Sequence, residues 1–163
     1  MSNPQTKTGS TVGDTFLIFE CHGEQFATPL LGVREIVETP EIQPVPYSKG
    51  HYLGIVNIRG GVISVIDLAK KLQMKTASKP WWAGFIMVLD LPGTRIGMRV
   101  DRVVAVRKLS PEEMSEAPML DDSLVDRRFL LGAARHANKL VTLFDLQKLI
   151  TEEELLLSKR QAS

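Results

Sequence analysis

The chain has 163 residues, 44% of them hydrophobic, and a formal net charge of +1, which suits one globular domain or two small halves that share a core. The balanced charge argues against a nucleic-acid partner, because nucleic-acid binders normally carry a basic excess. A lone cysteine, Cys21, excludes an internal disulfide and agrees with a reducing cytoplasm. The polar start and the lack of any run of 18 apolar residues predict neither a signal peptide nor a membrane-inserted segment.

Short strands dominate the prediction for the first half of the chain, about residues 15–74. Residues 1–14 are polar and are expected to form a flexible tail. Apolar stretches between turn signals favour strands, and the three prolines within 40–46 favour an extended connection. The expected elements are strands over 15–21, 25–31 and 32–38, a hairpin over 54–68, and a short helix or turn over 69–74.

The hairpin over Gly54–Leu68 is the stretch around which the chain is organised. Gly60-Gly61 predicts its turn, because glycine adopts the positive φ angles that tight hairpins require. Arg59 precedes this turn within an apolar hairpin, so its side chain is expected to have a partner in the protein or to face one outside it. The flanking residues favour a buried, pleated surface: Ile55, Val56, Ile58, Val62, Ile63, Val65 and Ile66.

The second half, about residues 80–150, follows a polar linker over 75–80. A closing helix is predicted over Gln147–Lys159, with residues 151–163 forming a C-terminal helix or tail whose acidic start and basic end suit the helix dipole. The other expected elements are strands over 82–89 and within 95–106, a helix start at Ser110, an acidic loop over 120–128, and a hairpin over 129–146 with Asn138 at its turn.

A repeat with an offset of 78 positions relates the two halves. Gly132 repeats Gly54, and residues 140–146 repeat residues 62–68 without a gap. Two sets of about five short strands, one set in each half, predict an all-β fold of two small barrels, which hide their sheet edges. Side chains fill barrels of this size, so we expect function on surfaces and at the seam between the halves.

A set of short motifs extends over roughly residues 15–150: Phe16–Phe19, Phe26–Pro29, Val33–Ile36, Pro44–Pro46, Gly54–Gly60, Val65–Leu68, Gly97–Val103 and Leu131–Leu146. Together these motifs resemble the CheW domain, the adaptor domain of bacterial chemosensory arrays. The resemblance implies two pseudo-repeated five-stranded SH3-like barrels that share a core.

The resemblance also implies a non-catalytic scaffold without cofactors. Such adaptors couple the cytoplasmic tip of methyl-accepting chemoreceptors to the regulatory domain of a CheA-type histidine kinase. The expected location is the cytoplasm, in association with membrane-anchored receptor arrays. The alternatives are a CheW-like adaptor of a pilus-motility or surface-sensing pathway and, in a different class, a small nucleic-acid-binding barrel, which would need a basic groove with stacking aromatics.

Two charged residues, Glu35 and Arg59, match the positions that the family uses around receptor binding. We expect them to pair beside the receptor groove, and the alternative is a purely structural ion pair. Because an exposed ion pair contributes only about 0–1 kcal/mol, stability alone explains Arg59 poorly. The resemblance assigns no kinase-contacting residue.

Four apolar residues, Val33, Ile36, Ile55 and Val100, are predicted to line the receptor groove, since helix-in-groove docking needs apolar walls. The alternative for each is ordinary barrel core, and exposure in the monomer distinguishes the two.

No catalytic or metal site is predicted. Asp67 and Asp145 recur at the same place in both halves, which favours caps of the following helical turns over paired acid–base catalysts. The three histidines are widely spaced, and one cysteine provides no thiolate cluster for a metal.

Overall fold

A computed structural model describes residues 15–46, 50–74, 83–116 and 129–162. The predicted tail, the linker over 75–80 and the acidic loop over 120–128 lie outside the described residues. No helix among the described residues is long and apolar enough to span a membrane.

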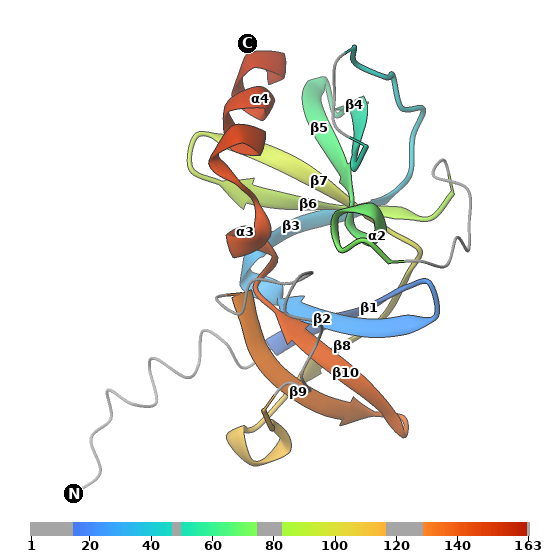
Figure 1. Cartoon of the computed structure of the whole chain (residues 1–163), viewed down its shortest axis with the longest axis vertical. Helices are drawn as coiled ribbons and strands as arrows, with labels where there is room; N and C mark the ends of the chain where they lie inside the picture. Colours follow the sequence, from blue (N-terminus) through green and yellow to red (C-terminus); the bar gives the residue numbers. More distant parts are fainter. Residues whose placement is uncertain (1–14, 47–49, 75–82, 117–128, 163) are drawn as a thin grey trace, which may run out of the picture.

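The fold is all-β, and the described residues form ten strands in two five-stranded sheets that build SH3-like barrels (Figure 1). We call the sheet with the order β8-β1-β2-β10-β9 the β1 sheet, and the sheet with the order β3-β6-β7-β5-β4 the β6 sheet. The strands are β1 (Thr15–Cys21), β2 (Glu24–Pro29), β3 (Val33–Glu38), β4 (Tyr52–Ile58), β5 (Gly61–Asp67), β6 (Phe85–Leu91), β7 (Thr94–Val100), β8 (Arg102–Lys108), β9 (Leu130–His136) and β10 (Lys139–Phe144).

Each sheet takes strands from both halves of the sequence, which differs from the predicted arrangement of one set of strands per half. The first half gives β1 and β2 to the β1 sheet but β3, β4 and β5 to the β6 sheet. Two parallel pairs join the halves, β2 with β10 and β5 with β7, whereas the other strand pairs are antiparallel. The two repeated halves therefore exchange strands. Neither half completes a sheet alone.

The 78-residue repeat extends to backbone conformation. Gly54 and Gly132 have φ angles of 142° and 143°, and each lies where a neighbouring segment approaches its strand. A Cβ on Gly54 would lie 2.2 Å from the carbonyl oxygen of Gln43, and one on Gly132 would lie 2.6 Å from that of Ser115. Both glycines therefore permit a close approach of backbone within the protein.

Matching aspartates, Asp67 at the end of β5 and Asp145 directly after β10, cap the short helices α2 (Leu68–Lys71) and α3 (Leu146–Leu149). The carboxylate of Asp67 accepts a hydrogen bond from the backbone of Ala69, and that of Asp145 accepts one from the backbone of Gln147. The predicted capping roles are confirmed.

The closing helix begins later than predicted and is separate from α3. The helix α4 (Glu152–Ala162) starts after Thr151, whose hydroxyl accepts a hydrogen bond from the backbone of Glu154. The Glu154 carboxylate in turn accepts a bond from the backbone of Thr151, which completes a capping box and starts a new helix. The acidic first turn and basic last turn of α4 agree with the sequence prediction.

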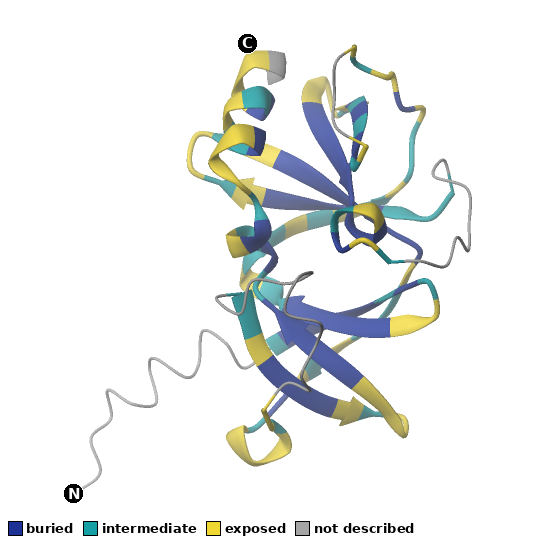
Figure 2. Ribbon diagram, in the orientation of Figure 1, coloured by how far each residue is buried: buried dark blue, intermediate teal, exposed yellow. Residues whose placement is uncertain are grey.

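Among the described residues, buried apolar side chains form three clusters, which lie in three layers. Figure 2 shows that the central strands are buried along most of their length. Phe16 and Ile18 of β1 face the interior of the barrel that the β1 sheet forms. Leu17 and Phe19 of the same strand pack in the layer between the two sheets. Because both faces of β1 and β6 are buried, their sequences are largely continuous apolar runs instead of alternating patterns. Val62 lies outside these layers and is 37% exposed, so its predicted burial is wrong.

A buried ion pair lies where the two barrels meet. Arg99 on β7 donates to the carboxylate of Asp101 at 2.9 Å and to the carbonyl of Ala83 at 2.8 Å, and its side chain is only 1% exposed. Asp101 also accepts from the backbone of His22, in the turn between β1 and β2. The pair therefore connects a strand of the β6 sheet to a turn of the β1 sheet.

Glu154 attaches α4 to the rest of the protein. Its buried carboxylate lies 2.6 Å from Nζ of Lys71 on α2 and 2.7 Å from Nε2 of His51. Burial alone would raise the pKa of Glu154, but the hydrogen bonds from Lys71 and Thr151 outweigh it and hold the pKa below the usual 4.5. The ionised carboxylate is therefore the form that the folded protein stabilises.

We expect Arg99→Met to lower the free energy of unfolding by about 3–5 kcal/mol, because it leaves the Asp101 carboxylate buried without its cation. Urea denaturation measures the change. The matched control is Arg102→Met, which removes an exposed pair with Glu20 and should cost less than about 1 kcal/mol. Equal losses in the two variants would contradict the structural role of the buried pair.

Glu154→Gln should lower stability at pH 7 by about 2 kcal/mol, because a buried charge-assisted network is lost. The pKa of this carboxyl is depressed in the folded chain, so its contribution is complete above its ordinary value and disappears as the pH falls through the folded-state pKa. The stability difference between wild type and variant should therefore shrink below about pH 4.5. A difference that stays constant between pH 7 and pH 3 would contradict this assignment.

Candidate functional site

Arg59 lies at the tip of the β4–β5 hairpin. The two loop residues are Arg59 and Gly60, with φ angles of 53° and 81°, whereas Gly61 begins β5. The predicted turn over Gly60-Gly61 is therefore displaced by one residue. The side chain of Asn57 accepts a hydrogen bond from the backbone of Gly60 at 3.0 Å and closes the turn, which explains why asparagine, arginine and glycine occur at this spacing.

The counterpart of this turn in the second hairpin has the same conformation without the same chemistry. Ala137 and Asn138, 78 positions later, have φ angles of 49° and 66°, and the predicted turn at Asn138 is confirmed. Alanine offers no charge where the first hairpin presents Arg59. The two hairpins thus share a backbone form, and the arginine is specific to the first.

The predicted pairing of Glu35 with Arg59 is confirmed. Nε of Arg59 donates to the Glu35 carboxylate at 2.9 Å, with side-chain exposures of 78% and 20%. Glu35 is on β3 and Arg59 follows β4, which are the two edges of the β6 sheet, so the contact joins one edge to the other. In the β1 sheet, Arg107 on β8 similarly donates to the carbonyl of Arg135 on β9.

The four predicted groove residues lie in different settings. Val33 and Ile55 are half-buried, and Ile36 is 37% exposed on the face of β3 opposite to Glu35. Val100 is completely buried in the layer between the sheets, so its prediction as a surface residue is wrong. An apolar residue type alone does not separate a core position from a docking position, and the strand exchange places β7 in the centre of the β6 sheet.

Several exposed apolar residues were absent from the sequence-based site. Leu31 is 77% exposed in η1 (Leu30–Gly32), which connects the two sheets, because β2 ends at Pro29 instead of continuing through Leu31 as predicted. The repeat could have indicated one exposed apolar position, because Val62 and its counterpart Leu140, 78 positions later, are both exposed near the start of the strand that follows their hairpin turn. The others are Val106, Leu131 and Leu156.

The described residues contain no group of three or more histidine, cysteine or acidic side chains placed to hold a metal ion. The Cys21 thiol is buried, and this burial raises its pKa to about 12, so the thiolate is not formed near neutral pH.

The protein is therefore a two-barrel SH3-like protein whose barrels exchange strands. An exposed ion pair joins the two edges of the β6 sheet. The family model of the CheW-like domain matches residues 15–154, and the chain belongs to this family.

The chain is similar in sequence to proteins named as chemotaxis proteins. A probable chemotaxis protein CheW of Rhizobium etli is 31% identical over 87% of this chain and 91% of its own length. The chemotaxis protein CheW of Klebsiella aerogenes is 29% identical, with 91% and 89% of the two chains covered. The solved structure of the scaffolding protein TtCheW from Thermoanaerobacter tengcongensis superposes with a TM-score of 0.73, at 24% identity, over 87% of this chain and 95% of that one.

Arg59→Gly should change the free energy of unfolding by less than about 1 kcal/mol, because the lost exposed pair is worth about 0–1 kcal/mol and glycine removes the cost of a left-handed backbone. Thermal or urea denaturation tests this balance. A loss above about 2 kcal/mol would show that the Glu35–Arg59 pair is chiefly structural.

Proposed function

We propose that this protein couples the cytoplasmic tip of methyl-accepting chemoreceptors to the regulatory domain of a CheA-type histidine kinase. It acts as a scaffold in the cytoplasm, associated with membrane-anchored receptor arrays, and carries out no chemical reaction itself. Membership of the CheW-like family supports this proposal, as do the names of its relatives.

The observation that carries the proposal is the placement of Arg59. A non-glycine residue in the left-handed region costs about 1–3 kcal/mol, whereas an exposed ion pair returns about 0–1 kcal/mol. Stability therefore does not account for an arginine at this turn. A guanidinium that is 78% exposed and oriented by Glu35 is instead available to a partner's carboxylate or backbone carbonyl.

The proposed receptor surface covers the β3 and β4 edges of the β6 sheet, and contains this ion pair, the half-buried Val33 and Ile55, and Ile36 on the outward face of β3. Arginine and large apolar side chains are typical anchors of protein interfaces. The exposed apolar residues of the β1 sheet, Val106, Leu131 and Leu140, provide a separate surface. Two surfaces on one rigid body allow a shift of the receptor to change the contacts of the kinase, which is all that coupling requires.

Arg59→Glu should weaken co-sedimentation with a cytoplasmic receptor fragment and the kinase by roughly tenfold or more, since charge reversal removes an interface anchor and repels Glu35. The matched control is Arg95→Glu, which reverses an exposed arginine of the β6–β7 hairpin that pairs with Asp90. Circular dichroism and thermal denaturation establish that both variants remain folded.

The charge-swapped variant, Glu35→Arg with Arg59→Glu, separates an internal role from an external one. Because the swap restores the ion pair but places the wrong charge before the receptor, we expect normal stability without recovered coupling. Recovery of coupling by the swap, or normal receptor binding by the folded Arg59→Glu variant, would contradict the proposed receptor surface.

A further inference from the structure

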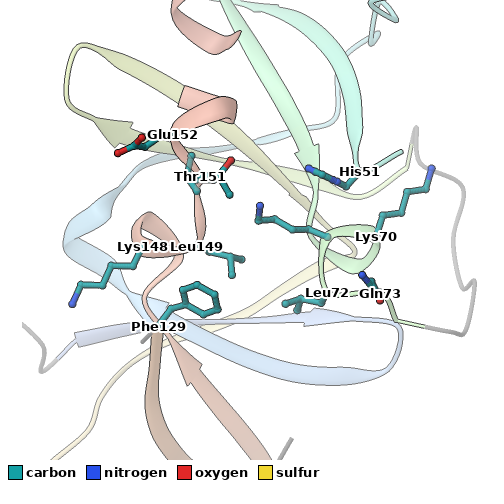
Figure 3. Close-up of a pocket in the computed structure, with 11 residues that line it drawn as sticks. His51, Lys70, Leu72, Gln73, Phe129, Lys148, Leu149, Thr151 and Glu152 are labelled. Atoms are coloured by element: carbon teal, nitrogen blue, oxygen red, sulfur yellow. The ribbon is translucent and has the colours of Figure 1, made fainter. Parts of the chain in front are cut away.

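A pocket of about 870 Å³ lies where α2, α3 and the start of α4 approach one another (Figure 3). The repeat builds it from matching parts, because α2 and α3 follow Asp67 and Asp145 at the same offset of 78 positions. The family comparison and the proposed receptor surface leave this pocket unexplained. Its volume is within the range of small-molecule sites.

The lining combines an apolar floor with amines. Leu72 and Leu149 are buried beneath the pocket, and Phe129 and Ile150 are half-buried at its wall. Three lysines and one histidine also line it, against one glutamate. Figure 3 shows that the Glu152 carboxylate and the amines of Lys70 and Lys148 are all directed away from the centre of the pocket.

Lys71 of α2 also lines the pocket. Its side chain is 11% exposed, and its Nζ contacts the Glu154 carboxylate at 2.6 Å. A lysine amine has three donors, and among the described residues only this one acceptor contacts it, which leaves hydrogen-bonding capacity for an incoming group. The carboxylate itself is occupied, because it also accepts from Thr151 and contacts His51.

Two further amines lie at the rim on opposite sides. Lys70 of α2 and its repeat counterpart Lys148 of α3 are exposed, and neither amine pairs with an acidic side chain in the parts of the chain that the structure describes. Their long side chains are free to turn toward a bound anion. The rim therefore has a net positive field above an apolar floor.

We propose that this pocket binds a small organic anion with an aromatic body, such as an aromatic carboxylate or sulfonate. The aromatic body would pack on Leu72, Phe129 and Leu149, and the anionic group would accept hydrogen bonds from Lys71, with Lys70 and Lys148 adding attraction. The proposal is independent of the receptor surface, because it involves neither Glu35 nor Arg59.

The test is a fluorescence titration of the full chain with 1-anilinonaphthalene-8-sulfonate, an aromatic sulfonate. We expect one saturable site, with affinity at least threefold weaker in Lys70→Gln/Lys148→Gln and weaker again after Lys71→Gln. The matched control is Lys108→Gln/Lys139→Gln, which removes two exposed lysines of the β1 sheet and should leave the affinity unchanged. Circular dichroism before each titration establishes that the variants are folded.

A second probe, N-phenyl-1-naphthylamine, has the same aromatic body without the sulfonate. It should bind at least tenfold more weakly than the sulfonate. Equal affinity for the two probes would overturn the anion site, and so would sulfonate binding that the pocket variants and the control variant change equally. Absence of saturable binding to the folded protein would also overturn it.

Discussion

Two parallel strand contacts, β2 with β10 and β5 with β7, are the constraint on which the rest of the structure depends. They attach the β9–β10 hairpin to the β1 sheet and the β4–β5 hairpin to the β6 sheet, and the antiparallel pairs β1 with β8 and β3 with β6 complete the exchange between the halves. Without them, the β1 sheet would lose its second hairpin and the β6 sheet would lose its first. The layer of apolar side chains between the sheets follows from this exchange, because β1, β6 and β7 must then bury both of their faces.

The core that the two sheets share makes the protein rigid. The Arg99–Asp101 pair adds a polar connection between the sheets at a point where desolvation makes an unpaired charge costly. The rigid core fixes the positions of the surface residues. Arg59, at one edge of the β6 sheet, has a left-handed backbone conformation that costs free energy in the folded protein. This combination suits the proposed function, because a rigid body between two partner surfaces allows a change of contacts at one surface to alter the contacts at the other.

The sequence predicted what depends on local chemistry. The bounds of β1, the aspartate caps and the pairing of Glu35 with Arg59 follow from residue types at fixed spacings. The sequence did not predict which strands pair, because a repeat indicates that two halves are alike and contains no information on whether they exchange strands. Val100 and Val62 show the second limit, since β-branched residues occur both in the core and on exposed strand positions. The sequence did not predict the Arg99–Asp101 ion pair, because its contribution to stability comes from burial, which the local sequence does not reveal.

The claim that the two sheets form one cooperative unit is tested most directly by native-state hydrogen exchange of the backbone amides. The account predicts that the slowest amides of β2 and β10 in the β1 sheet open with the same free energy as those of β5 and β7 in the β6 sheet, equal to the free energy of global unfolding. Two separate values, with one sheet opening while the other stays protected, would contradict the shared core.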